Sequence, residues 1–306
     1  MPERIIVTGG TGFIGKVLCR RLVEKGYEVV VLSRNASRAS AAFGGAVTGI
    51  GWDGRSADGW SDRADGAYGI VNLAGANIAS GRWTVEMKEK ILRSRLDAGR
   101  AVSEAVARAS VKPRVLVQAS AAGIYGDRGE ERLDEAARPG TGFLSEVAVR
   151  WEESTAAVAG TGVRWVAVRT AIVLGGGGGF MERILPPFKF FLGGIPGNGR
   201  RWISWIHIRD EVDAIIFLLE RSDLEGPFNL AAPQQQRARD FYRAVGRAAG
   251  RPSWLPVPAP LARLALGEMA DELILAGQRV IPGGLAAAGF EFRYKELDTA
   301  LAEILR

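Results

Sequence analysis

The amino-acid sequence predicts an α/β fold, in which a doubly wound parallel sheet is covered by helices. Strand-like apolar segments alternate with amphipathic helical segments through the first two-thirds of the 306 residues, a rhythm typical of parallel sheets. Residues 28–32 are a glutamate followed by four apolar residues, as expected of a strand buried on both faces. The 40 glycines and the 47% share of hydrophobic residues fit a globular enzyme rather than a disordered or fibrous chain.

The predicted elements follow one another in strand–helix order. We expect strands at residues 4–7, 28–32, 68–75, 114–119 and 163–169. We expect helices at residues 13–25, 84–109 and 142–159. Two short segments, 206–210 and 227–230, are expected to return to the main sheet, and the chain is expected to be mostly helical from residue 238 onward.

Net charge and cysteine content narrow the class of protein. The formal charge of +6 comes mostly from scattered arginines, without the basic block or aromatic stripe of a nucleic-acid-binding module. No uncharged apolar stretch reaches the roughly 18 residues of a membrane span, and no signal peptide precedes the first strand. One histidine and one cysteine leave no metal cluster, and Cys19 is expected to be a small core residue in a reducing compartment. We therefore expect a cytoplasmic protein that binds no nucleic acid, membrane or metal.

A glycine-rich turn joins the first strand to the first helix. Its letters, TGGTGFIG at 8–15, place glycines at positions 9, 12 and 15. Gly9 permits a tight turn, Gly12 lets a pyrophosphate approach the backbone N–H groups of the helix N-terminus, and Gly15 lets the helix pack closely on the strand. Within one strand–turn–helix unit this pattern predicts a dinucleotide site, with a plain structural turn as the alternative. The expected cofactor-binding residues of the turn are Gly9, Thr11, Gly12, Phe13, Ile14 and Gly15.

The end of the second strand indicates which dinucleotide binds. In NAD sites an acidic residue about 20 positions after the glycines binds the ribose 2′-hydroxyl. Here Ser33 and Arg34 occupy that place, and Arg38 follows one turn later. A guanidinium pairs with a 2′-phosphate that a carboxylate would repel, so the three residues predict NADP(H). The alternative is that both arginines are ordinary solvated side chains.

Small residues end the third strand, where open α/β sheets bind ligands. Leu73, Ala74 and Gly75 are therefore expected to let the cofactor lie over the strand end. The cofactor-binding domain is expected at residues 1–174, completed by about 205–232. A smaller lobe is expected from 175–204 and 233–306, beginning at a run of five glycines.

Several motifs, in this order, resemble those of extended short-chain dehydrogenases/reductases. They are the glycine turn, NLAG at 72–75, IYG at 124–126, Arg169 with VLG at 173–175, and His207 with Asp210. The letters RWT at 82–84, SR at 94–95, WISWIH at 202–207 and GFEFRY at 289–294 resemble a subgroup called epimerase family proteins. The resemblance covers essentially the whole chain and implies a Rossmann domain that binds NADP(H), with Ser120 and Leu174 among the cofactor-binding residues.

The sequence departs from this family at the catalytic positions. Extended members usually use a Tyr-x-x-x-Lys pair and a nearby serine for proton transfer. The resemblance places Phe143 and Val147 at the pair and Ala121 at the serine, with Ser120 beside it. Phenylalanine has no ionisable proton and valine no charge, so we expect the usual catalytic device to be absent.

Other side chains are candidates for the missing acid or base. Ser120 and Tyr125 are the predicted catalytic residues, and Lys88, Lys90 and Glu146 are further candidates. A packing role for Tyr125, solvated positions for the two lysines and an ion pair for Glu146 are the alternatives.

Arg95 and His207 each allow two interpretations. The resemblance places Arg95 where relatives have an active-site asparagine, and a guanidinium that points inward would contact the cofactor or an acidic substrate group. An outward arginine on the helix surface is the alternative. For His207 we expect a structural role, orienting its loop with Asp210 nearby and capping a helix, rather than catalysis.

Two classes of function remain open. The first is an NADP(H)-dependent oxidoreductase or epimerase that acts on a hydroxyl or carbonyl substrate with relocated acid and base groups. The second is an NADP(H)-binding sensor or interaction protein without turnover. The aromatic segment 188–205 is expected to form a substrate pocket, a core or a homodimer surface.

Overall fold

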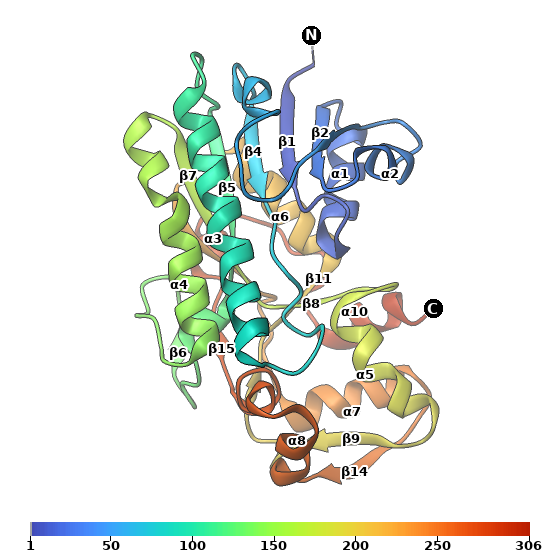
Figure 1. The fold of residues 1–306 in the computed structure, drawn as a ribbon. Helices are drawn as coiled ribbons and strands as arrows, with labels where there is room; N and C mark the ends of the chain where they lie inside the picture. Colours follow the sequence, from blue (N-terminus) through green and yellow to red (C-terminus); the bar gives the residue numbers. More distant parts are fainter. Residues whose placement is uncertain (1) are drawn as a thin grey trace.

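A seven-stranded parallel sheet forms the centre of the protein, whose computed structural model describes residues 2–306 (Figure 1). In spatial order its strands are β12 (Gly226–Leu230), β7 (Arg164–Thr170), β5 (Val115–Ala121), β4 (Gly69–Asn72), β1 (Arg4–Thr8), β2 (Glu28–Ser33) and β3 (Thr48–Gly51). The strand order reverses between β1 and β4, the position at which doubly wound sheets bind ligands. The predicted fold class is confirmed.

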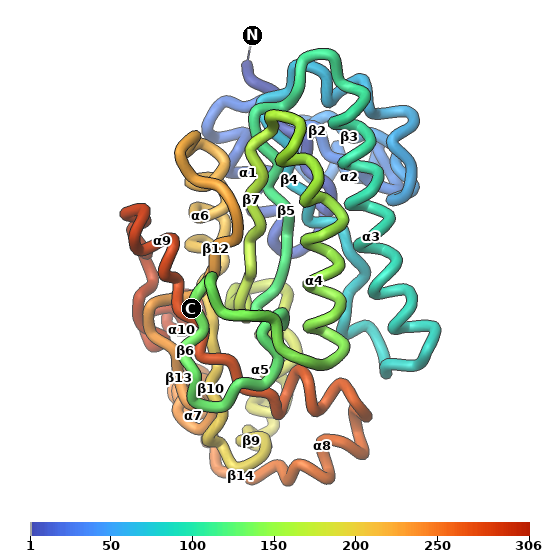
Figure 2. Tube along the Cα trace, turned by 90° about the vertical axis from the view of Figure 1, so that its left-hand side faces the viewer, coloured from blue at the N-terminus to red at the C-terminus, as the bar shows by residue number. Residues whose placement is uncertain are grey.

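Helices cover both faces of this sheet (Figure 2). The helices of this part are α1 (Phe13–Glu24), α2 (Ala36–Ala41), α3 (Val85–Arg108), α4 (Phe143–Ala156) and α6 (Ile208–Glu220), with 3-10 turns η1 (Ser61–Ala64), η2 (Ala122–Tyr125) and η3 (Ala157–Thr161). Alternate residues of β1 show the two-sided burial: Ile5 and Val7 join the core with α1 and α6, whereas Ile6 joins the core with α3. Both cores exclude water, as the apolar strands predict.

A smaller, mostly helical lobe lies beyond the carboxyl ends of the strands, at the lower end of Figures 1 and 2. Its helices are α5 (Gly179–Lys189), α7 (Ala238–Ala248), α8 (Ala259–Leu266) and α10 (Leu297–Ile304), with a π-helical turn η4 (Ala270–Leu275). The short helix α9 (Gly283–Ala287) packs on β12 instead, and its Leu285 belongs to the core of the main sheet. Short strands pair as β9 (Gly193–Pro196) with β14 (Ser253–Val257), β10 (Trp202–Ile203) with β13 (Gln236–Arg237), β8 (Ile172–Leu174) with β11 (Trp205–His207), and β6 (Arg132–Leu133) with β15 (Arg279–Val280).

One sheet prediction is wrong. Residues 227–230 join the main sheet as part of β12, but residues 206–210 do not. The chain pairs there with β8 in a separate two-stranded sheet and turns into α6 at Ile208. His207 ends the strand by capping that helix, because its Nδ1 accepts a hydrogen bond from the Arg209 backbone N–H at 3.2 Å.

The aromatic segment 188–205 is divided between core and surface. Phe188, Ile203 and Trp205 are buried with Phe241 in the core of the smaller lobe. The adjoining side chains at 190–192 are more than half exposed. The two ends of the segment therefore serve packing, one of the three roles expected of it, whereas residues 189–192 are exposed.

Two buried acidic residues follow His207 on α6. Asp210 accepts hydrogen bonds from the backbone N–H groups of Arg293 and Tyr294 at 2.9 and 2.8 Å, and so ties the C-terminal part of the chain to the main sheet. Glu211 is fully buried; its Oε1 accepts a hydrogen bond from the Thr170 hydroxyl at 2.8 Å, while its Oε2 has no partner among residues 2–306. Burial raises the pKa of Glu211 from its ordinary 4.5 to about 8.

The raised pKa of Glu211 predicts a loss of stability toward alkaline pH. The folded protein keeps this proton after the unfolded chain has lost it, so the free energy of unfolding falls as pH rises from about 4.5 to about 8, by roughly 1.4 kcal/mol per pH unit. Glu211→Gln removes the titration and flattens this part of the curve. Urea unfolding of both proteins at several pH values measures the effect, and parallel curves would contradict it.

Candidate functional site

A buried chain of hydrogen bonds joins the carboxyl ends of β1, β4 and β5. The Thr8 hydroxyl donates to Asn72 Oδ1 at 2.6 Å, and the Asn72 amide donates to Gln118 Oε1 at 2.8 Å. The Thr8 oxygen also accepts from the Ala74 backbone N–H at 3.0 Å. All three side chains are inaccessible to solvent. The chain fixes the residues after β4 next to the turn after β1.

The glycine turn is packed so tightly that side chains have no room. Gly9 has φ +65°, and a Cβ there would lie 2.7 Å from the Leu73 carbonyl oxygen. A Cβ at Gly15 would lie 2.3 Å from the Gly9 carbonyl oxygen. Gly12 begins α1 without a side-chain cap, and the first turn of α1 has no acidic residue. The N-terminus of α1 is thus a cradle suited to a phosphate group.

Phe13 connects this turn to the run of five glycines. Added Cβ atoms at Gly178 and Gly179 would each lie 2.7 Å from an atom of the Phe13 ring. A Cβ at Gly175 would lie 3.0 Å from the same ring and 2.8 Å from the Ile208 side chain. Close approach to the Phe13 ring therefore accounts for three of the five glycines, whereas Gly177 has φ +72° and no neighbour within 4 Å. Ile14 and Thr11, the other predicted residues of the turn, are partly buried beside it.

The predicted 2′-phosphate residues lie at the carboxyl end of β2. Ser33 ends the strand, Arg34 follows it, and Arg38 lies on α2, a helix that the sequence did not predict. Asn35 caps this helix by accepting a hydrogen bond from the Arg38 backbone N–H at 2.9 Å. Both arginines are exposed at the surface. All three residues therefore follow one another closely at the carboxyl end of β2, and their role in binding a 2′-phosphate stays a prediction.

Arg95 points inward, beneath the segment that follows β4. Its side chain is 9% exposed, packs over the Trp151 ring at 4.7 Å, and donates to the carbonyl oxygens of Ala76 and Ile91. A Cβ on Gly75 would touch its guanidinium at 3.0 Å. Within residues 2–306 no carboxylate lies within ion-pair distance, and burial lowers the Arg95 pKa to about 10. An anionic ligand would compensate this buried charge.

Leu73 and Ala74, which follow β4, are half-buried. Leu174 lies apart from them, at the end of β8. The Leu174 side chain is fully buried in the core of the smaller lobe. A cofactor contact at Leu174 would therefore come from its backbone.

Ser120 and Tyr125 belong to one polar network. The Ser120 hydroxyl donates to Glu152 Oε1 at 2.6 Å. Arg169 donates two further hydrogen bonds to the Glu152 carboxylate, at 2.9 and 3.0 Å. Arg169 also donates to the Tyr125 oxygen at 3.1 Å, and Tyr125 donates to Asn229 Oδ1 at 2.7 Å. Tyr125 is fully buried and burial raises its pKa. These contacts favour the packing role for Tyr125.

The first turn of α4 carries the residues expected at the catalytic pair. Phe143 begins the helix and lies beneath Lys88, whose Nζ is 4.9 Å from the ring centre, while Val147 is buried one turn later. Glu146 pairs with Arg150 on the helix surface at 3.3 Å, as its alternative interpretation predicted. Of the candidates named from the sequence, Lys88 thus lies beside the position of the missing tyrosine.

His207 has the structural role predicted for it. Besides capping α6, its Nε2 contacts Glu303 at 3.0 Å and its ring stacks on Tyr294 at 3.8 Å. It does not bond to Asp210, which holds the backbone near Tyr294 instead. Burial lowers the pKa of His207, which favours the neutral form.

Sequence reasoning missed three acidic residues of this region. Glu152 joins Ser120 to Arg169, and Glu268 and Glu272 reach α3 and α4 from the smaller lobe. Single acids on helices form no motif, and their partners lie up to 180 residues away in the chain.

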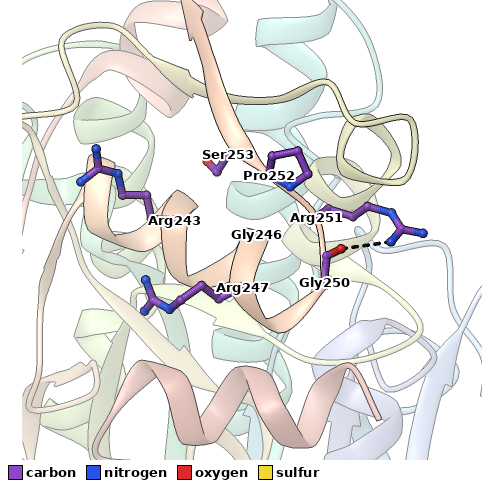
Figure 3. Close-up of a pocket in the computed structure, with 7 residues that line it drawn as sticks. All are labelled: Arg243, Gly246, Arg247, Gly250, Arg251, Pro252 and Ser253. Carbon is purple, nitrogen blue, oxygen red and sulfur yellow. Dashed lines mark hydrogen bonds between the residues drawn. The ribbon is translucent and has the colours of Figure 1, made fainter.

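A separate hollow of about 480 Å³ lies on the smaller lobe, where α7 meets β14 (Figure 3). It is lined by Arg243, Gly246, Arg247, Gly250, Arg251, Pro252 and Ser253. None of the predicted cofactor residues takes part in it. Within residues 2–306, no helix is long and apolar enough to cross a membrane and no group of three metal-ligating side chains gathers.

Comparison with known proteins identifies two matching families. The model of the NAD dependent epimerase/dehydratase family matches residues 5–231. A domain of unknown function, DUF1731, matches residues 257–304. The epimerase family protein YfhF of Bacillus subtilis is 38% identical over 98% of this chain and 97% of its own length. The epimerase family protein SDR39U1 of Bos taurus is 35% identical over 99% of both chains.

Solved structures agree with these relatives. Human epimerase family protein SDR39U1, crystallised with NADPH, superposes with a TM-score of 0.90 at 32% identity over 99% of both chains. A nucleoside-diphosphate sugar epimerase from Corynebacterium glutamicum gives a TM-score of 0.79 at 31% identity, covering all of this chain and 58% of that one.

The tight packing of the glycine turn predicts that Gly15→Ala impairs cofactor binding. The new methyl group would overlap backbone atoms of Gly9 and Gly10, so α1 must shift. We expect at least a roughly tenfold loss of affinity for a nicotinamide dinucleotide and about 1–3 kcal/mol lower stability. Calorimetric titration measures the affinity. Gly160→Ala, where an added Cβ meets nothing within 4 Å, is the control; wild-type affinity in Gly15→Ala would refute the cradle.

Proposed function

Because the chain belongs to the NAD dependent epimerase/dehydratase family, we propose that it is an NADP(H)-dependent oxidoreductase or epimerase acting on a hydroxyl or carbonyl substrate. The observation that carries the proposal is the glycine cradle at the switch point between β1 and β4. The NADPH in the human relative's structure supports the choice of cofactor.

The residues present fit such a cofactor. Gly9, Gly12 and Gly15 would hold the pyrophosphate against α1, and Arg34 with Arg38 would pair with the 2′-phosphate. Bound NADP(H) supplies hydride chemistry. The protein's own side chains must then orient the substrate, exclude water and move a proton.

The sequence contains no Tyr-x-x-x-Lys pair. None of its five tyrosines is followed four residues later by a lysine. The hydroxyl groups of Ser120 and Tyr125 are both engaged with internal partners. These facts also support the second candidate function, an NADP(H)-binding sensor without turnover.

One experiment separates the two functions. The protein is titrated with NADPH and with NADH, and cofactor oxidation is then followed with a panel of aldehydes, ketones and keto-sugars. Turnover with any carbonyl compound supports the enzyme, and tight NADPH binding without turnover on any of them supports the sensor. Tighter binding of NADH than of NADPH would overturn the assignment of the cofactor.

The position of Arg34 after β2 predicts that the protein binds NADPH more tightly than NADH. Arg34→Asp removes a charge-assisted hydrogen bond to the 2′-phosphate, worth about 1.5–3 kcal/mol, so NADPH affinity should fall roughly 10- to 100-fold while NADH affinity changes little. Binding titrations with both cofactors measure the difference. The control is Arg20→Asp, an equal charge change at an exposed position of α1; equal losses for both cofactors would show that Arg34 is merely structural.

A further inference from the structure

Lys88 lies in the first turn of α3, against the first residue of α4. The Phe143 ring lies near the ammonium group of Lys88, and the Trp83 indole contacts the same ring edge-on, with the ring centres 5.0 Å apart. The first turn of α4 packs in turn on the segment after β5, where the Ser145 hydroxyl donates to the Ile124 carbonyl at 2.7 Å. Lys88 therefore stands beyond the carboxyl ends of the strands, on the side where open α/β sheets bind ligands.

The smaller lobe brings an acidic residue to this lysine. Glu268 lies between α8 and η4, and its carboxylate is 2.6 Å from Lys88 Nζ. The Arg82 guanidinium donates to the Leu264 carbonyl oxygen at 2.6 Å. Figure 1 shows the beginning of α3 facing α8 across this junction. Residues 264–268 thus cover the start of α3.

Glu272 fixes the same segment to α4. Its two carboxylate oxygens accept hydrogen bonds from the backbone N–H groups of Phe143 and Leu144, both at 2.7 Å. An anion at a helix N-terminus is favourable, because it satisfies free N–H groups and the helix dipole. Gly142 makes room for it, since a Cβ there would lie 3.0 Å from Glu272 Oε1. The position of Glu268 is therefore set by a second, independent contact.

The other candidate acids and bases are less suited to proton transfer. Tyr125 is fully buried, and the Ser120 hydroxyl already donates a hydrogen bond to Glu152. Glu146 is an exposed helix residue paired with Arg150. Lys90 is an exposed residue of α3. Lys88 remains, with a side chain 29% exposed that contacts the Phe143 ring.

We propose that Lys88 is the proton-transfer residue of this site, with Glu268 as its ion-pair partner and Glu272 as the residue that positions the segment carrying Glu268. The assignment rests on the proposed function. It also gives the domain of unknown function a role, because residues 257–304 would complete the active site.

When a carbonyl compound is reduced, the ammonium of Lys88 donates a proton to the carbonyl oxygen as the C=O π bond opens. The carbonyl carbon takes a hydride, which bound NADPH supplies. The products are the alcohol, NADP⁺ and a neutral Lys88 amine, which regains its proton from water. Glu268 remains a carboxylate throughout. Oxidation of an alcohol moves the same proton back to the amine.

Substitutions of Lys88 separate proton transfer from a structural role. Lys88→Met should lower turnover about 100-fold or more with unchanged NADPH affinity. Lys88→Arg keeps the ion pair with Glu268 but holds its proton at all working pH values, so it should stay equally impaired. Lys90→Met, two residues along the same helix, should turn over like wild type. Full activity in Lys88→Arg would overturn the proposal.

A second readout needs no substrate. Acetic anhydride labelling followed by mass spectrometry measures how accessible each lysine is, and saturating NADPH should slow labelling of Lys88 at least about threefold without affecting Lys90. Glu272→Gln should speed labelling of Lys88, whereas Asp271→Asn, the same charge change at a residue paired with Arg263, should not.

These outcomes distinguish the two proposals. Tight NADPH binding with unchanged labelling of Lys88 removes Lys88 from the site and leaves the proposed function standing. Absence of NADPH binding overturns the proposed function, and absence of turnover with every carbonyl compound overturns the catalytic role of Lys88 together with the enzyme assignment.

Discussion

The buried hydrogen bonds from Thr8 to Asn72 and Gln118 are the constraint on which the site depends. They join three neighbouring strands at their carboxyl ends, inside a region where an unpaired polar group would cost about 1–3 kcal/mol. Because Thr8 also holds the backbone at Ala74, the strand ends cannot slide past one another. The narrow space between the glycine turn and the Leu73 carbonyl follows from that register.

The main sheet was predictable because its strands are apolar on both faces. Residues 28–32 and 114–119 are buried parallel strands as predicted. β3 and α2 escaped prediction for physical reasons: β3 contains two glycines and lies at the sheet edge, and α2 has six residues held by the Asn35 cap. Residues 206–210 were wrongly predicted to join the main sheet, because a short apolar strand does not show with which other strand it pairs.

The packing of the glycine turn was more predictable than the contacts of Lys88. Gly12 and Gly15 pack on Gly9 a few residues earlier, so these contacts follow from local spacing, whereas the contact of Gly9 with Leu73 depends on the sheet. The contact between Lys88 and Glu268 joins residues 180 positions apart and needs the smaller lobe to be folded. No local pattern indicates such a pair. The buried orientation of Arg95 likewise depends on Trp151, which lies on another helix.

The Phe13 ring links the cofactor-binding turn of the main sheet to the smaller lobe, because it packs against glycines of the five-glycine run. The ring belongs to the first turn of α1, and the glycines lead into α5 of the smaller lobe. Any ligand that restrains the N-terminus of α1 therefore also restrains the root of α5. By thermodynamic linkage, a ligand that bound more tightly when α5 is ordered would in turn stabilise α5.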